Sequence, residues 1–119
     1  MIKIGKNISK FSTYSCKPET KYELVDIIRL RIFEEGPNCD LNDIDTSFIT
    51  DMSYLFYNSV FNGNISKWNV SKVTNMIHIF RESKFNQDIS NWKINKDCLT
   101  NEMFTDCSIR KEYKPKLPR

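Results

Sequence analysis

The hydrophobic positions in the central part of the chain recur with a spacing of 24 residues. A shift of 24 positions places Trp68 on Trp92, and most of the large apolar residues around them align in the same way. The aligned pairs include Thr50 and Thr74, Met52 and Met76, Phe56 and Phe80, Phe61 and Phe85, and Ile65 and Ile89. A period of this length is typical of repeat proteins, in which each unit buries its apolar face only against its neighbours. The stretch 48–96 therefore predicts a stack of similar units.

The first half of each unit has the spacing of a short strand. Ile65-x-x-Trp68-x-Val70 and Ile89-x-x-Trp92-x-Ile94 follow the pattern of a leucine-rich-repeat strand, and Leu41-x-x-Ile44-x-Thr46 is an earlier, degenerate copy. Trp68 and Trp92 replace a leucine of that pattern. We therefore expect both indole rings to pack inward rather than to form an exposed stacking platform.

The second half of each unit has the spacing of a short helix. Met52, Leu55 and Phe56 stand at positions i, i+3 and i+4, and Thr50 before them is a good N-cap residue. The fold class expected is α/β: a short leucine-rich-repeat-like solenoid of strand–short helix units with an N-terminal α-helical cap. Asn62 and Asn86 follow in the return loop, where an amide side chain can satisfy backbone groups that lack partners.

The N-terminal cap is predicted over residues 20–35. Thr20 and Glu23 form a capping box, and Gly36 followed by Pro37 ends the helix. An apolar stripe and further apolar residues on other faces suit a helix that covers the open end of a stack. The stripe consists of Leu24, Val25, Ile28 and Ile32.

The chain is short enough to be a single domain. Within residues 1–119 we expect an N-terminal extension (1–17, a short strand or hairpin), the capping helix (18–36), the repeats (37–108) and an exposed, irregular basic tail (109–119).

Composition narrows the function classes. A net charge of +3, with 28% charged and 39% hydrophobic residues, is ordinary for a globular protein and weak for a nucleic-acid binder. No apolar run is long enough to span a membrane, and the first residues carry no signal-peptide pattern, so a cytoplasmic location is expected. The four cysteines have no CxxC spacing and are expected to be thiols.

No residue set points to catalysis or to a bound cofactor. His78 is the single histidine and aligns with the variable position Tyr54, so we expect a solvated surface side chain. Asp43, Asp45 and Asp51 lack the loop pattern of a calcium site and are interpreted as surface acids. There is no glycine-rich phosphate loop. We therefore expect no enzyme activity, no cofactor, no metal and no small-molecule substrate.

The repeat resembles that of the BspA-like leucine-rich-repeat family of bacterial surface proteins. The residues that carry the resemblance are Ile49-Thr50-Asp51-Met52 and Phe61-Asn62-Gly63-Asn64-Ile65-Ser66-Lys67-Trp68, with their second copies at Val73–Met76 and Phe85–Trp92. The resemblance implies an α/β solenoid that contacts other proteins, often in adhesion. The small number of repeats and the lack of an export signal favour a small intracellular binder or inhibitor. The further idea that a phage or another mobile element carries this binder rests on analogy alone.

The predicted contact surface is the strand face of the solenoid. Polar residues alternate there with the buried ones, point away from the core, and have no evident structural role. They run from acidic in the first unit to basic in the later ones, which would orient a protein partner. Nucleic-acid binding and surface adhesion are the alternatives. The candidate residues are Asp43, Asp45, Lys67, Asn69, Ser71, Lys72, Asn91, Lys93, Asn95 and Lys96.

Overall fold

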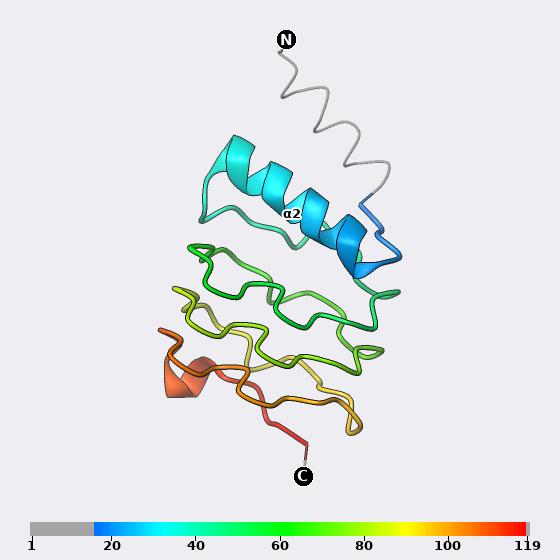
Figure 1. Cartoon of the computed structure of the whole chain (residues 1–119), viewed down its shortest axis with the longest axis vertical. Coiled ribbons are helices and arrows are strands. Elements are labelled where there is room, and N and C mark those ends of the chain that lie inside the picture. Colours follow the sequence, from blue (N-terminus) through cyan, green and yellow to red (C-terminus); the bar gives the residue numbers. More distant parts are fainter. Residues whose placement is uncertain (1–15, 119) are drawn as a thin grey trace.

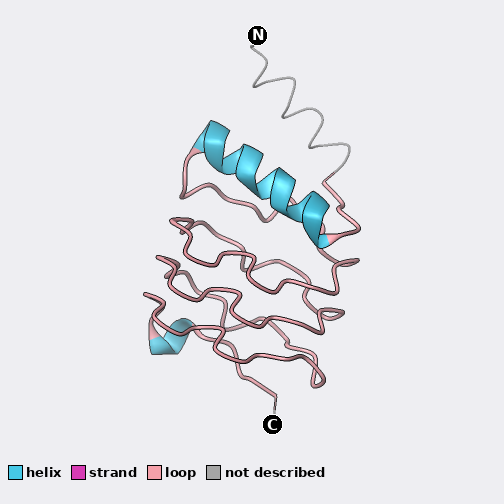
Figure 2. Ribbon diagram, in the orientation of Figure 1, coloured by secondary structure: helices cyan, strands magenta, loops and turns pink. Residues whose placement is uncertain are grey.

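An α-helix lies across one end of a stack of irregular coils (Figure 1). The structure is a computed structural model and describes residues 16–118. Its elements are helix α2 (Lys21–Glu35) and a short 3-10 helix, η1 (Lys111–Tyr113). Turns and extended segments make up the rest of the described chain (Figure 2). The strand or hairpin predicted within residues 1–17 falls on residues outside the described part, apart from 16 and 17.

The predicted α/β solenoid of strand–short helix units is wrong. Within residues 16–118, β pairing is limited to isolated parallel bridges that join Asp51 to Asn75 and Asn75 to Leu99. Residues 37–108 contain no helix. The 24-residue repeat instead forms coils of successive turns, which we number as coil 1 (40–63), coil 2 (64–87) and coil 3 (88–111).

Left-handed residues prevent the predicted short helices from forming. Tyr54 and Asn58 have φ of 60° and 52°, and the equivalent residues of coils 2 and 3 are also at positive φ. Two turns result, closed by the Leu55 amide on the Met52 carbonyl at 3.2 Å and by the Tyr57 amide on the Tyr54 carbonyl at 3.2 Å. A residue in this region interrupts the i to i−4 bonding of an α-helix. The equivalent positive-φ residues are His78, Glu82, Glu102 and Asp106.

Backbone hydrogen bonds join the coils at every second residue. Four amides of coil 1 donate to carbonyls of coil 2, and the same four positions of coil 2 donate to coil 3. These amides are therefore engaged with the next coil instead of with the preceding turn of a helix. The coil 1 donors are Met52, Tyr54, Phe56 and Asn58, with acceptors Asn75, Ile77, Ile79 and Arg81. The coil 2 donors are Met76, His78, Phe80 and Glu82, with acceptors Leu99, Asn101, Met103 and Thr105.

Aromatic side chains stack in columns along the core. Phe80 lies between Phe56 and Phe104, with ring centroids 5.5 Å and 5.7 Å away and nearly parallel planes. Phe61 and Phe85 form a second column, 6.2 Å apart. Phe56, Phe80, Phe61 and Phe85 are at most 1% exposed. Each coil therefore buries its apolar face against the next coil, as the repeat predicts.

The inward packing predicted for the two tryptophans is confirmed. Trp68 and Trp92 are each 4% exposed, and their rings are stacked. The indole Nε1 of Trp68 donates to the Leu41 carbonyl at 2.8 Å, and that of Trp92 donates to the equivalent carbonyl of Ile65 at 3.0 Å. Both polar groups of the rings are thus satisfied inside the stack.

The return-loop asparagines form the predicted structural contacts. The Asn62 Oδ1 accepts from the Asn86 amide at 2.7 Å, and the Asn86 Oδ1 accepts from the Arg110 amide at 2.9 Å. Each side chain therefore supplies a partner for an amide of the following coil.

Helix α2 begins and ends where the sequence predicts. The Thr20 Oγ1 accepts from the Glu23 amide at 3.2 Å, and Gly36 adopts φ of 95° at the other end. Leu24 and Ile28 are buried in the same core cluster as the coils. The outer side of the helix leaves apolar side chains exposed, namely Tyr22, Leu30 and Phe33.

A buried arginine, which the sequence analysis missed, ties α2 to coil 1. Arg31 is 8% exposed, and its Nη1 bonds both carboxylate oxygens of Asp43 at 3.1 Å and 3.0 Å. Its Nε donates to Glu35 at 3.0 Å, and its Nη2 donates to the Asp40 carbonyl at 3.1 Å. Burial opposes the charge, but the hydrogen bonds to Asp43 and Glu35 outweigh it and raise the pKa of Arg31.

The predicted basic tail is only partly exposed. Ile109 and Pro115 are buried, and the Tyr113 carbonyl accepts from the Ile89 amide at 3.0 Å. The Lys114 Nζ lies 5.2 Å from the Phe104 ring centroid. Residues 109–118 therefore cover part of coil 3.

Candidate functional site

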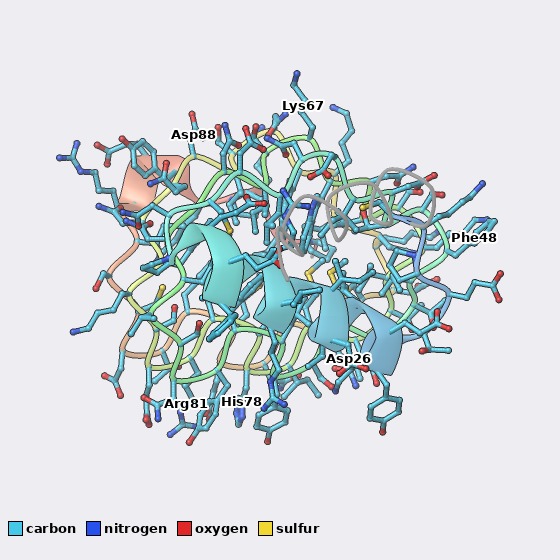
Figure 3. The ribbon with its side chains drawn as sticks, turned by 90° about the horizontal axis from the view of Figure 1, so that it is seen from above. Asp26, Phe48, Lys67, His78, Arg81 and Asp88 are labelled. Atoms are coloured by element: carbon cyan, nitrogen blue, oxygen red, sulfur yellow. The ribbon has the colours of Figure 1, made fainter. Side chains whose placement is uncertain are left out.

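The predicted contact residues gather mainly on one side of the stack. Buried Trp68 and Val70 alternate with exposed Lys67, Asn69 and Ser71, although turns rather than a strand present them. Figure 3 shows Lys67 and Asp88 on this side, with His78 and Arg81 on the opposite side. We call this surface the lysine face and define it as Lys67, Asn69, Ser71, Asn91, Lys93, Lys96 and Lys116.

Two adjoining depressions mark the lysine face. One, of about 350 Å³, lies between coils 2 and 3. The other, of about 560 Å³, lies between coil 3 and the C-terminal segment. Asn91 and Lys93 line both of them. The first also includes Lys67, Asn69 and Ser71, and the second includes Lys96, Lys116, Leu117 and Pro118.

Two asparagines that we expected to have no structural role support the local backbone. The Asn69 Oδ1 accepts from the Ser71 amide at 2.9 Å. Asn95 accepts from the Asp97 amide at 2.9 Å and donates to the Ser71 carbonyl at 3.2 Å. Such bonds fix turns, so that expectation is wrong for both residues.

The acidic members of the predicted site also make structural contacts. Asp43 pairs with Arg31. The Asp45 Oδ1 accepts from the Ser47 amide at 2.9 Å, and hydrogen bonds from Ser47 lower the pKa of Asp45. Lys72 lies beside Phe48, 5.9 Å from its ring centroid, and lines neither depression. The chemically available part of the predicted site is therefore its lysine-rich half.

The opposite side carries a cluster that the sequence analysis did not identify. Tyr54, His78 and Glu102 occupy equivalent positions in the three coils. The Tyr54 and His78 rings are 4.9 Å apart, and the His78 Nε2 lies 3.1 Å from the Glu102 Oε1. Arg81 also pairs with Glu102. The 24-residue spacing was the signal that could have found this column.

His78 is less exposed than predicted, with 18% of its side chain accessible. Its side-chain hydrogen-bond partners within residues 16–118 are Glu102 and Arg81. Neither partner is a serine, threonine or cysteine, so the described residues show no nucleophile hydrogen-bonded to this histidine.

The cysteines are dispersed through the core. Cys39 and Cys98 are buried, and burial raises the pKa of each thiol, which disfavours the reactive thiolate. The Cys107 Sγ contacts the Phe85 carbonyl at 3.4 Å, and the Cys16 Sγ lies 3.8 Å from Asp43. Cys39, Cys98 and Cys107 form no disulfide, as predicted for these three. Among the described residues, no group of three or more histidine, cysteine or acidic side chains could hold a metal ion.

The fold and the lysine face define a repeat protein with an open, lysine-rich surface. Residues 30–113 match the family described as "Mycoplasma protein of unknown function, DUF285". The match covers more than two thirds of the chain, so the chain belongs to this family. No curated protein and no solved structure matches the chain. In the part that the structure describes, no helix is long and apolar enough to cross a membrane.

Proposed function

We propose that this chain is a non-enzymatic protein-binding module whose contact surface is the lysine face. The observation that carries the proposal is the pair of adjoining depressions that share Asn91 and Lys93. Both are open to solvent, and lysine and asparagine side chains line them together with apolar residues such as Trp92. Such a surface suits the broad, partly polar contact of a protein partner better than the enclosed pocket that a small molecule needs.

The charges of the lysine face favour an acidic partner surface. Lys67, Lys93 and Lys96 are exposed, and among residues 16–118 no carboxylate side chain lines either depression. Exposed lysines steer association more than they strengthen the final complex.

Nucleic acid is the alternative partner. The exposed acid Asp88 interrupts the basic character of this side, and among the described residues no exposed aromatic ring lines the depressions for base stacking. Both features favour protein over nucleic acid.

The resemblance to BspA-like repeats supports protein contact through the residues of the repeat, although not through the fold that it implied. Within this proposal the chain acts as a small inhibitor or effector. The thiols of Cys39, Cys98 and Cys107 favour a reducing compartment, so we place its action in the cytoplasm.

The test compares two charge reversals of equal size. One variant carries Lys67→Glu and Lys93→Glu, and the control carries Lys84→Glu and Lys111→Glu, two exposed lysines outside both depressions. Quantitative mass spectrometry after capture from host lysate identifies proteins that the unmodified chain retains. Association rates are then measured with the purified partner. We expect the first variant to bind at least about tenfold more slowly, with a stability change within about 0.5 kcal/mol, and the control to bind normally.

Equal losses in both variants would mean that net charge alone drives binding, and normal binding of the first variant would place the contact elsewhere. Labelled single-stranded and duplex DNA and RNA are tested in parallel. Tight binding that weakens steeply with salt would favour the nucleic-acid alternative.

A further inference from the structure

Over residues 52–58, and over the equivalent residues of coil 2, the hydrogen bonds between coils all run in one direction. At alternate residues from 52 to 58, the amides point to coil 2, and the carbonyls that receive them lie at alternate residues from 75 to 81. Coil 2 repeats this arrangement toward coil 3. Each coil therefore has an amide edge facing the C-terminal end of the stack and a carbonyl edge facing α2.

The amide edge of coil 3 has no partner within residues 16–118. Its four amides stand in the register of the inner ladders, but no described group accepts from them. The carbonyls of three of these residues are engaged by the Met103, Thr105 and Cys107 amides of the same coil. We call this surface the open amide edge and define it as Thr100, Glu102, Phe104 and Asp106. In Figure 1 its coil is the lowest of the stack.

Two kinds of occupant are disfavoured by the chemistry of the edge. A second copy related by twofold symmetry would set amides against amides, because this edge offers donors. An anionic segment would meet Glu102 and Asp106, which are both exposed. The edge therefore matches a segment that presents a row of uncharged hydrogen-bond acceptors.

A second copy in head-to-tail arrangement is also disfavoured. Its carbonyl edge would be that of coil 1, and α2 lies across this coil (Figure 1). The Lys21 Nζ reaches the Ser53 Oγ at 2.9 Å and lies 3.9 Å from Asp51, so the helix is anchored beside the carbonyls concerned. Leu24 and Ile28 of α2 are buried in the common core. The helix thus acts as a terminal cap against growth of the stack.

We propose that the open amide edge docks a backbone segment of another protein that presents carbonyls at alternate residues, as an uncapped coil of this repeat does. The recognition is between main chains, as in the addition of a strand to a sheet edge. A regular β-strand fits less well, because its own amides alternate with its carbonyls and would face donors. The surface is distinct from the lysine face.

The first measurement is amide hydrogen exchange of the intact chain followed by NMR. The amides of Met76, His78, Phe80 and Glu82 should exchange at least about 100-fold more slowly than unprotected amides. The four amides of the open edge should exchange nearly as fast as unprotected ones. Slow exchange of the edge amides in the free chain would overturn the proposal, because it would show that the edge is already covered.

The second measurement is a titration of the labelled chain with a synthetic peptide of residues 72–84, which holds the carbonyls that coil 1 recognises. The matched control peptide carries His78→Pro. Proline fixes φ near −65°, whereas His78 has φ of 57° in the coil, so the control cannot adopt the carbonyl-presenting form. We expect shifts and at least about tenfold slower exchange at the edge amides with the first peptide and neither effect with the control.

Shifts located elsewhere, no shifts at all, or equal effects of the two peptides would each contradict the proposal. The chain with Lys67→Glu and Lys93→Glu should bind the peptide as the unmodified chain does. Failure of this proposal is therefore separable from failure of the lysine-face proposal.

Discussion

The indole ring of Trp92 lies parallel to that of Trp68, with centroids 6.5 Å apart and planes 8° apart. The two rings occupy the same position in successive coils, and each donates to a carbonyl of the coil before it. This pairing packs coil 2 against coil 3 inside the core. The stability of the stack should therefore depend strongly on both rings.

We predict that Trp92→Ala lowers the free energy of unfolding by about 3–5 kcal/mol, because it removes a buried aromatic ring and leaves a cavity. Urea denaturation followed by circular dichroism measures the change. Trp92→Phe, which keeps a ring but loses the bond to the Ile65 carbonyl, should cost clearly less. An unchanged unfolding midpoint in Trp92→Ala would show that the ring does not support the core.

The asparagine contacts between return loops lead to a second prediction. Asn62→Ala should cost about 1–3 kcal/mol, because the Asn86 amide loses its acceptor in a partly buried loop. Asn62→Asp keeps an acceptor oxygen and should cost less. Asn91→Ala serves as the control, since Asn91 is exposed, and it should stay within about 0.5 kcal/mol. Equal effects of Asn62→Ala and Asn91→Ala would argue against the structural role.

Gly63 is required by the close approach of two chain segments. A Cβ atom at this position would lie 1.8 Å from the Cys39 carbonyl oxygen and 2.8 Å from a ring carbon of Phe61. Since the first neighbour is backbone and cannot turn aside, Gly63→Ala should cost about 3 kcal/mol.

Gly36→Ala is the matched control for Gly63. No described atom lies within 4 Å of the added atom there, so what remains is the strain of φ at 95° with ψ at 168°, about 1–3 kcal/mol. A thermal melt of both variants ranks the two effects. A smaller loss for Gly63→Ala than for Gly36→Ala would mean that the segments do not meet as closely as the structure shows.

The pKa of Asp88 gives a prediction for acid conditions. Hydrogen bonds from the Ser90 hydroxyl at 2.6 Å and the Ser90 amide at 2.9 Å hold this pKa below its usual 3.8. The stabilisation is present above pH 3.8 and is lost as the pH falls through the folded pKa. An NMR titration of the Asp88 carboxyl carbon should therefore have a midpoint below 3.8, and Ser90→Ala should raise it. A midpoint that Ser90→Ala leaves unchanged would show that Ser90 is not the cause.

Part of the lysine face could be predicted from sequence. The alternation of Lys67, Asn69 and Ser71 with buried residues was enough to place them outward. The structural roles of Asn69 and Asn95 were also readable, since an asparagine side chain commonly bonds the amide two residues on. The contribution of Lys116 to the lysine face could not be predicted, because it depends on how the C-terminal segment folds back onto coil 3.

The sequence by itself determined the 24-residue register, the bounds of α2 and the inward position of the tryptophans. Burial of apolar residues and local capping decide these features, and both follow from the order of residues along the chain. The conformation of residues 50–59 was decided only by the tertiary structure. Met52, Leu55 and Phe56 can face the core from a helix or from two successive turns. The choice depends on amides that bond carbonyls 23 residues further on, together with left-handed Tyr54 and Asn58, and no local pattern encodes either.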